Sequence, residues 1–370
     1  MIPVNRPLLN GNEKKYLNEC IDTGWISSEG PFIKKFEEKF SAAVNRKFGI
    51  AVSSGTAALD VALAAIELSD GDEVIMPAFT IISCIKSILN SNAVPVLVDC
   101  DRRNFNIDVS CIEEKITAKT KAILVVHIYG LPVDMDAVMG LAKKYNLRVV
   151  EDAAEMHGQY YKGRPCGSFG DISIFSFYPN KLITTGEGGM VVTDDSHLAR
   201  RANSLRNLCF IPNQRFIHEE LGWNYRMTNM QAAIGLAQLE RLNEFVKIKR
   251  NIGSLYNSLL SDLTQIDLPV PKEAYAENIY WVYPIVIKQS SMMTAKELAT
   301  ELLDLEVQTR PFFWPMHKQP IFEKLNLFRL ESYPNSEYIA KNGLYLPSGV
   351  GTTESEIIYV SNTIRRIFNE

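Results

Sequence analysis

Short runs rich in β-branched residues alternate with helical stretches from about residue 50 to residue 195, and this alternation constrains the fold most. The runs carry nearly continuous Val and Ile, as strands buried on both faces do. The predicted strands are 73–79, 94–100, 122–130, 147–154, 171–177 and 189–195, with predicted helices at 57–68, 82–92 and 134–146. The pattern predicts an α/β fold in which helices flank a mixed, mostly parallel sheet.

The pattern changes after residue 228. One long helical stretch is predicted over 228–263, with Thr228 or Asn229 available to cap its N-terminus. The elements predicted beyond it are a strand at 278–287 and helices at 294–307 and 353–368. We therefore predict a large α/β domain over 1–245 and a smaller C-terminal α+β domain over 246–370.

Composition and charge exclude several classes of protein. The chain of 370 residues has a net charge of -4 and lacks a basic block of the size that a nucleic acid requires. The N-terminal segment has no basic stretch followed by an apolar core, and no apolar run approaches the roughly 20 residues of a membrane helix. The six cysteines are scattered without a CxxC pair, which favours free thiols over disulfides or a zinc site. We predict a cytoplasmic protein that binds no nucleic acid, membrane or metal.

A run of small polar residues, Ser53 to Thr56, precedes the predicted helix at 57–68. In open α/β sheets, ligands bind at the carboxyl ends of strands, where a helix N-terminus offers free N–H groups and a positive dipole end. Gly55 would let a phosphate approach the backbone, and the hydroxyls of Ser54 and Thr56 would add hydrogen bonds. Taken alone, the run is explained as well by an ordinary N-cap.

Two charged residues follow other predicted strands. Asp152 lies where the apolar run at 147–154 ends, and Lys181 follows the strand at 171–177. A capping carboxylate and a surface lysine are the common explanations for each residue alone. Burial, however, lowers the pKa of a lysine, and the neutral amine forms a Schiff base with an aldehyde. The glycines after Lys181 would let the backbone approach a bound ring.

The three features make chemical sense together. A phosphate cradle, a carboxylate and a Schiff-base lysine are the parts that pyridoxal 5'-phosphate (PLP) needs. The carboxylate keeps the pyridine nitrogen protonated, which makes the ring an electron sink. A dinucleotide site is not supported, because TTGEGG precedes a strand, and no GxxxxGK(S/T) loop is present. The sequence thus predicts an enzyme that uses PLP.

Several long motifs resemble those of the DegT/DnrJ/EryC1/StrS family of sugar-nucleotide aminotransferases, in the family's order and over almost the whole chain. The motifs are GTAALDVAL, VVEDAAE, GSFGDISIFSFYPNK, TTGEGGMVVTDD and GWNYRMTNMQAAIGLAQLE. The resemblance implies the fold-type-I architecture of PLP-dependent aminotransferases.

The resemblance also implies roles for single residues. Lys181 is expected to be the catalytic residue that binds the cofactor's aldehyde. Asp152 is expected to pair with the pyridine nitrogen, and Glu155 to lie near the phenolic oxygen. The expected phosphate contacts are Gly55, Thr56 and Ser176, beside the hydroxyl of Ser54.

Asn224, in GWNYRMTN, resembles the asparagine that reaches the phosphate from the neighbouring subunit. This implies a homodimer with shared active sites, although a turn or helix-start residue would explain Asn224 equally well from sequence. Ile81 departs from the family, since many relatives carry an aromatic residue there that stacks on the pyridine ring. Either the ring rests on the aliphatic side chain of Ile81, or Phe79 turns in to replace the aromatic.

Lys181 also separates two reactions within the family. The deoxygenating dehydratases of the family carry His at this position, so Lys181 favours transamination. The segment NKLITTGEGGM resembles members that aminate C4 of a 4-keto-6-deoxy sugar, above all those that make GDP-perosamine from GDP-4-keto-6-deoxymannose and L-glutamate. The candidates that this resemblance implies for the nucleotide-sugar pocket are Trp25, Arg310, Phe313 and His317. Core packing would also explain Trp25 and Phe313, and a backbone-bonded loop residue would explain His317.

Several alternatives are compatible with the sequence. The segments 177–181 and 206–225 depart from the GDP-perosamine set, so a dTDP- or UDP-linked 4-keto-6-deoxy sugar is an alternative substrate. A PLP-dependent dehydratase, or a different sugar transaminase, is a second alternative. A non-catalytic protein that binds a sugar nucleotide is a third, and the pair Lys181 and Asp152 argues against it. The family also implies a product used in a cell-surface glycan, such as the O-antigen of lipopolysaccharide.

Overall fold

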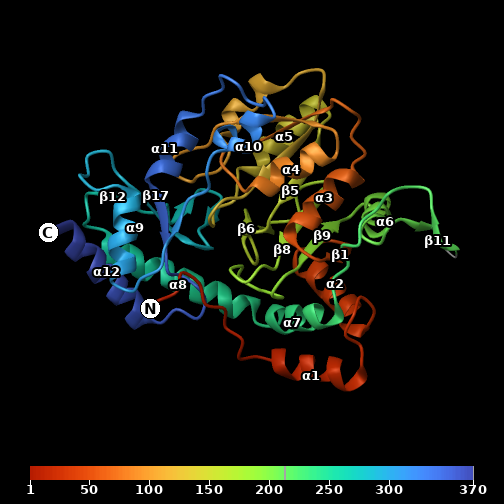
Figure 1. The fold of residues 1–370 in the computed structure, drawn as a ribbon, viewed down its shortest axis with the longest axis horizontal. Helices are drawn as coiled ribbons and strands as arrows, with labels where there is room; N and C mark the ends of the chain where they lie inside the picture. Colours follow the sequence, from red (N-terminus) through yellow and green to blue (C-terminus); the bar gives the residue numbers. More distant parts are fainter. Residues whose placement is uncertain (212–213, 370) are drawn as a thin grey trace.

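The computed structural model describes residues 1–211 and 214–369, and its main feature is a seven-stranded sheet (Figure 1). In order across the sheet the strands are β1 (Phe48–Val52), β9 (Gly189–Thr193), β8 (Ile172–Ser176), β5 (Arg148–Asp152), β4 (Thr120–Val126), β2 (Glu73–Pro77) and β3 (Val94–Val98). Strand β9 runs antiparallel to its neighbours β1 and β8, and the other neighbouring pairs are parallel. The predicted mixed, mostly parallel sheet is confirmed.

Successive residues of each strand enter two different cores, because side chains alternate across a strand. In β8, Ile174 packs into one core and its neighbour Phe175 into the other. The helices that pack into the first core include α3 (Gly55–Ala65), α4 (Ile82–Asn90) and α6 (Ser196–Leu205). Those of the second include α2 (Pro31–Ala43), α5 (Met135–Tyr145) and α7 (Asn229–Leu239). Helices on both faces account for the continuous Val and Ile of the strands.

Several helices begin with reciprocal capping boxes. In α7, Thr228 Oγ1 accepts from the N–H of Gln231 at 3.2 Å, and the N–H of Thr228 donates to Gln231 Oε1 at 2.8 Å. Thr294 and Glu297 make the same pair of bonds at α9 (Ala295–Asp304). Each box satisfies two backbone donors that a helix start would leave free. The predicted N-cap at Thr228 is confirmed.

The single long helix predicted over 228–263 is wrong. Helix α7 ends before Glu240, and α8 (Leu242–Leu260) begins a new helix. At the break, Glu240 accepts hydrogen bonds from Asn12 Nδ2 and Tyr16 OH, both at 2.7 Å. These partners belong to the start of α1 (Glu13–Thr23), so the break lies where a distant segment holds the chain.

The C-terminal part has its own sheet and core. The sheet is antiparallel, in the order β12 (Ile266–Asp267), β15 (Tyr283–Ile287), β17 (Gly343–Leu346) and β16 (Arg310–Pro311). Helices α8, α9 and α12 (Glu354–Asn369) contribute the other side of this core. The strand predicted at 278–287 is shorter than expected, because the chain joins the ladder only at Tyr283. The predicted boundary between 245 and 246 falls inside α8 and stays a prediction.

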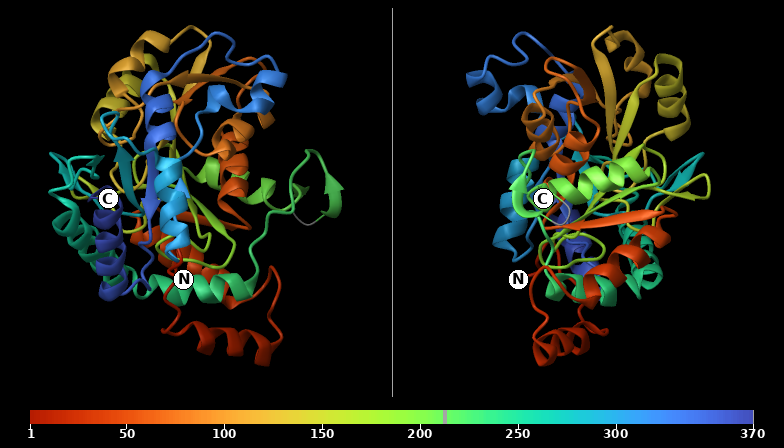
Figure 2. Two further views of the ribbon diagram at one scale, coloured as in Figure 1. Left: turned by 60° about the vertical axis from the view of Figure 1, so that its left-hand side comes forward. Right: turned by 90° about the vertical axis from the view of Figure 1, so that its right-hand side faces the viewer.

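The remaining elements are short. Two are the helices α10 (Pro320–Lys324) and α11 (Pro334–Asn342). Three two-stranded sheets pair β6 (Tyr160–Tyr161) with β7 (Arg164–Pro165), β10 (Phe210–Ile211) with β11 (Gln214–His218), and β13 (Lys272–Glu273) with β14 (Ala276–Glu277). Short 3-10 helices lie at Val109–Cys111, Glu113–Lys115 and Met316–Lys318. Strand β11 extends away from the body of the molecule (Figure 2). Over 1–211 and 214–369, no helix has the length and apolar character needed to cross a membrane.

Candidate active site

A cavity of about 390 Å³ opens where parallel strands of the large sheet end. Eight of the nine predicted cofactor residues line it, namely Ser54, Gly55, Thr56, Ile81, Asp152, Glu155, Ser176 and Lys181. Phe313, predicted for the sugar pocket, lines it as well. The carboxyl ends of parallel strands meet at one edge of a sheet, which brings these distant residues together. Their roles remain predictions.

The N-terminus of α3 forms one wall of the cavity. Ser54 caps the helix, because its Oγ accepts the N–H of Ala57 at 3.1 Å. Gly55 begins the helix against Ser176, and a Cβ on Gly55 would lie only 2.7 Å from the Cβ of Ser176. Thr56 Oγ1 is hydrogen-bonded to Ser83 Oγ at 2.8 Å. Both sequence interpretations therefore hold: the run is an N-cap, and it presents a helix N-terminus to a cavity.

The glycines after Lys181 were predicted to let the backbone approach a bound ring, but their contacts indicate another role. A Cβ on Gly189 would lie 2.4 Å from the carbonyl oxygen of Ser54, and one on Gly188 would lie 2.2 Å from Thr185 Oγ1. Gly186 adopts a φ of +83°, which favours glycine. These glycines let the turn fold tightly and let β9 pass Ser54, so they shape the chain rather than the cavity lining.

Asp152 ends β5 and is buried. Its Oδ1 accepts the N–H of Ala154 at 3.0 Å, and the Cys84 thiol donates to its Oδ2 at 3.6 Å. Burial raises the pKa of Asp152, while the Ala154 hydrogen bond and the charge of Lys181 oppose that rise. A cationic ligand group in the cavity would therefore stabilise the ionised carboxylate.

Lys181 is not a surface lysine, since its side chain is only 11% exposed. Its Nζ lies 3.7 Å from Glu155 Oε1, and Glu155 Oε2 accepts the N–H of Tyr129 at 2.7 Å. Burial lowers the pKa of Lys181, and the charges of Glu155 and Asp152 oppose that shift. Burial likewise raises the pKa of Glu155. An amine with a lowered pKa at a cavity wall is available as a neutral nucleophile.

Ile81 and Phe79 have different surroundings. Ile81 lines the cavity and is 43% exposed. Phe79 is fully buried and packs against the rings of Tyr129, Phe312 and Phe313. Phe79 therefore does not turn in to replace the aromatic, and the cavity presents an aliphatic side chain at this position.

Four predicted residues lie outside this cavity. Asn224 is exposed beside Asn207, with which it forms an isolated bridge, and Trp25 is 49% exposed. Arg310 lines a neighbouring cavity of about 250 Å³. His317 is buried, and its Nε2 lies 2.8 Å from Glu337 Oε1. The packing of His317 supports a structural role for that side chain.

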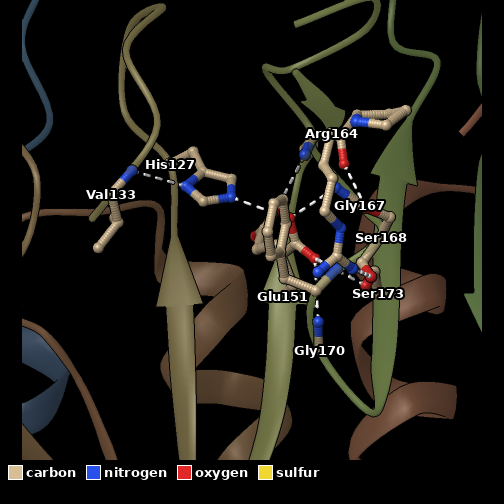
Figure 3. Close-up of polar contacts among 12 residues, drawn as sticks. His127, Val133, Glu151, Arg164, Gly167, Ser168, Gly170 and Ser173 are labelled. Carbon is tan, nitrogen blue, oxygen red and sulfur yellow. Dashed lines mark hydrogen bonds and ion pairs between the residues drawn. The ribbon is translucent and has the colours of Figure 1, made fainter. Parts of the chain in front are cut away.

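Glu151, one residue before Asp152, is the centre of a buried hydrogen-bond network (Figure 3). Its carboxylate accepts from His127 Nε2 at 3.1 Å and from the N–H groups of Gly167, Phe169 and Gly170 and the hydroxyl of Ser173. Burial alone would raise the pKa of Glu151, but these donors bring it down to about 2. His127 Nδ1 accepts the N–H of Val133 at 3.0 Å, which leaves Nε2 to donate to Glu151.

Part of the cavity wall was not predicted from the sequence. His127 lines it and ends the apolar run AILVV, which is the same signal that identifies Asp152. Trp281 and Tyr345 also line it, and both come from the C-terminal part of the chain. No local pattern marks these two aromatics, because their position depends on how the C-terminal sheet packs against the larger one.

The comparisons with known proteins agree with this geometry. The model of the DegT/DnrJ/EryC1/StrS aminotransferase family matches residues 7–365. The chain is 42% identical to the GDP-perosamine synthase of Escherichia coli O157:H7 over 369 residues, which is 100% of this chain and 99% of that protein. It is also 42% identical to the GDP-perosamine synthase of Caulobacter vibrioides, over 96% of this chain and 95% of that one. The solved structure of S. venezuelae DesV in complex with a ketimine intermediate is 31% identical, with a TM-score of 0.90, and covers 97% of this chain and 95% of its own.

Proposed function

This chain belongs to the DegT/DnrJ/EryC1/StrS aminotransferase family, and we propose that it transfers an amino group from L-glutamate to C4 of GDP-4-keto-6-deoxymannose. The product would be GDP-perosamine. The observation that best supports this substrate is the 42% identity, over essentially the whole chain, to the GDP-perosamine synthase of Escherichia coli O157:H7. PLP is the cofactor of this enzyme.

The residues of the cavity fit PLP. Lys181 Nζ supplies the amine for its aldehyde, and the buried carboxylate of Asp152 suits a protonated pyridine nitrogen. The N-terminus of α3 suits a phosphate, and Gly55 lets the side chain of Ser176 approach that terminus closely. Bound in this way, PLP supplies an electron sink for the amino transfer.

We assign the protein's own part in the reaction to three side chains. Lys181 Nζ binds the cofactor and then holds and delivers the proton that moves during the transfer. Asp152 keeps the pyridine nitrogen protonated through the charge of its carboxylate. Glu155, fixed by the N–H of Tyr129, favours the charged form of Lys181 from 3.7 Å away. Aromatic side chains around the cavity exclude water from these groups.

Phe313 and Arg310 are the stronger candidates for the nucleotide-sugar pocket. Phe313 shares the cavity with Lys181. Arg310 lines the neighbouring cavity, and both cavities share Trp281 and Tyr345 as lining residues. A guanidinium in this neighbouring cavity would suit the diphosphate of a sugar nucleotide. The proposal does not depend on His317.

We also propose a homodimer in which Asn224 reaches the cofactor phosphate of the second subunit. Its exposure outside its own cavity and its bridge to Asn207, which precedes β10 by three residues, support this. Trp25 is exposed as well, which leaves it available to a second copy. A cytoplasmic location and a use of the product in O-antigen remain predictions of the sequence.

A product assay tests the substrate. Purified protein with PLP and L-glutamate would receive 4-keto-6-deoxy sugars linked to GDP, dTDP or UDP, and mass spectrometry would follow the products. We expect an amino sugar from the GDP substrate alone. Amination of a dTDP or UDP sugar would contradict the GDP assignment but keep the reaction. A Lys181→Ala variant controls for amination that does not depend on the cavity.

A further inference from the structure

Trp281 contacts the amine of Lys181 with the face of its ring and also fixes the backbone beside it. The centre of the ring lies 3.9 Å from Lys181 Nζ. The indole N–H donates to the carbonyl oxygen of Asn180 at 3.0 Å. The indole is 6% exposed and lines the cavity. One side chain from the C-terminal part thus holds both the loop and its reactive group.

We propose that Trp281 is a positioning residue that stabilises the ammonium form of Lys181 over its ring whenever the amine is not bonded to the cofactor. The proposal rests on the proposed function, in which Lys181 is the reacting amine. A cation over an aromatic face is attracted by the ring quadrupole, and the indole of Trp is the most effective ring. The attraction grows when the pair is withdrawn from water, as it is here.

The surroundings of Lys181 explain why such a contact matters. Burial disfavours its ammonium form, and Glu155 and Asp152 favour it. The titratable groups that face this amine or its cavity are Asp152, Glu155, Cys84, His127, His157, Tyr178, Glu187 and Tyr345. Trp281 carries no charge and accepts no proton. It therefore favours the ammonium form without offering a base that would remove the proton.

The loop of Lys181 is anchored on two sides. Trp281 binds the carbonyl of Asn180, and Asn5 Nδ2 donates to the carbonyl of Pro179 at 2.9 Å. The Trp281 ring also stacks with Tyr129, at 6.2 Å and 26° between ring planes. The N–H of Tyr129 in turn holds Glu155. The indole and the carboxylate near the amine thus belong to one connected set of contacts.

Two variants separate the ring's electrostatic effect from its structural one. Trp281→Phe and Trp281→Leu both lose the N–H to Asn180 and both shrink the side chain, but only Phe keeps an aromatic face. The apoenzyme of each would be labelled with acetic anhydride across a pH series. Mass spectrometry of the Lys181 peptide then gives the apparent pKa of this amine. Thermal unfolding checks that each variant is folded, and Trp281→Met replaces Leu if that variant is not.

We expect the apparent pKa of Lys181 to be about 0.5 to 1 unit lower in Trp281→Leu than in Trp281→Phe, with the wild type highest. Equal values in the two variants, or a higher value in Leu, would overturn the proposal, because the indole would then only hold the loop or exclude water. The labelling needs no cofactor. A protein that fails to bind PLP therefore contradicts the proposed function and leaves this comparison intact.

Discussion

Lys181 and Lys249 are both largely withdrawn from water, yet their surroundings differ. Lys249 lies on α8, is 3% exposed, and its Nζ donates to the carbonyl oxygen of Ser348. Burial lowers its pKa to about 7, with no opposing charge among the residues that the structure describes. Lys181 borders a cavity with two carboxylates near its amine. Burial alone does not make a lysine reactive; the open space and the opposing charges distinguish the two.

The largest effect is expected from removing one lysine and not the other. Lys181→Ala should lower the rate of amino transfer at least about 10³-fold, because it removes both the nucleophile and the proton carrier. Lys249→Met should leave that rate within a few-fold of wild type. Steady-state assays of both variants at the same enzyme concentration measure this. A similar loss in both would erase the distinction between the lysines.

The carboxylate of Asp152 is the next point at which the two sites differ. Asp152→Asn keeps the shape of the side chain and the acceptor for the N–H of Ala154. It removes the negative charge near Lys181, so that Lys181, like Lys249, would lack this carboxylate. We expect a loss of about 10² to 10³-fold in the rate constant of amino transfer, with the protein still folded. Single-turnover measurements with enzyme already saturated with PLP separate a slower amino transfer from weaker binding of the cofactor. An unchanged rate would show that the pyridine nitrogen needs no anionic partner here.

Lys249 should affect stability rather than activity. Its contribution to the free energy of unfolding is unfavourable, whereas that of a lysine paired with a carboxylate is favourable. Its folded pKa of about 7 is lower than in the unfolded chain, so the penalty for burying the ammonium is fully present below pH 7. The penalty disappears as the pH rises towards the unfolded pKa. Lys249→Met should therefore be about 1–2 kcal/mol more stable than wild type at pH 7, and less so at pH 9.5.

Urea unfolding at the two pH values, at one protein concentration, tests this expectation. A Met variant that is less stable at pH 7 would show that the hydrogen bond to Ser348 outweighs the burial of the charge.

The smallest effect concerns the wall that faces the cofactor ring. Ile81→Phe should increase the affinity for PLP by a few-fold, since an aromatic pair adds about 0.5–1.5 kcal/mol beyond its buried area. Phe79→Leu is the matched control, because Phe79 packs away from the cavity and should alter stability but not affinity. Cofactor titration of the apoenzymes measures both. A larger affinity change from Phe79 than from Ile81 would reverse this assignment.

Local patterns predicted the parts of the site that depend on strand ends. Asp152, Ser176 and Lys181 meet because their strands are neighbours and parallel, and hydrophobic runs reveal such strands. The contacts of Lys181 with Trp281, and the break between α7 and α8 at Glu240, were not predictable in this way. Both depend on side chains more than 90 residues away, and no local spacing encodes such contacts.

The most direct test of the contrast between the two lysines is to locate the cofactor covalently. The protein would be incubated with PLP, reduced with borohydride, digested and mapped by mass spectrometry. We predict a pyridoxyl group on Lys181 and none on Lys249. A modification on Lys249, on another lysine or on none would contradict the assignment of this cavity as the active site.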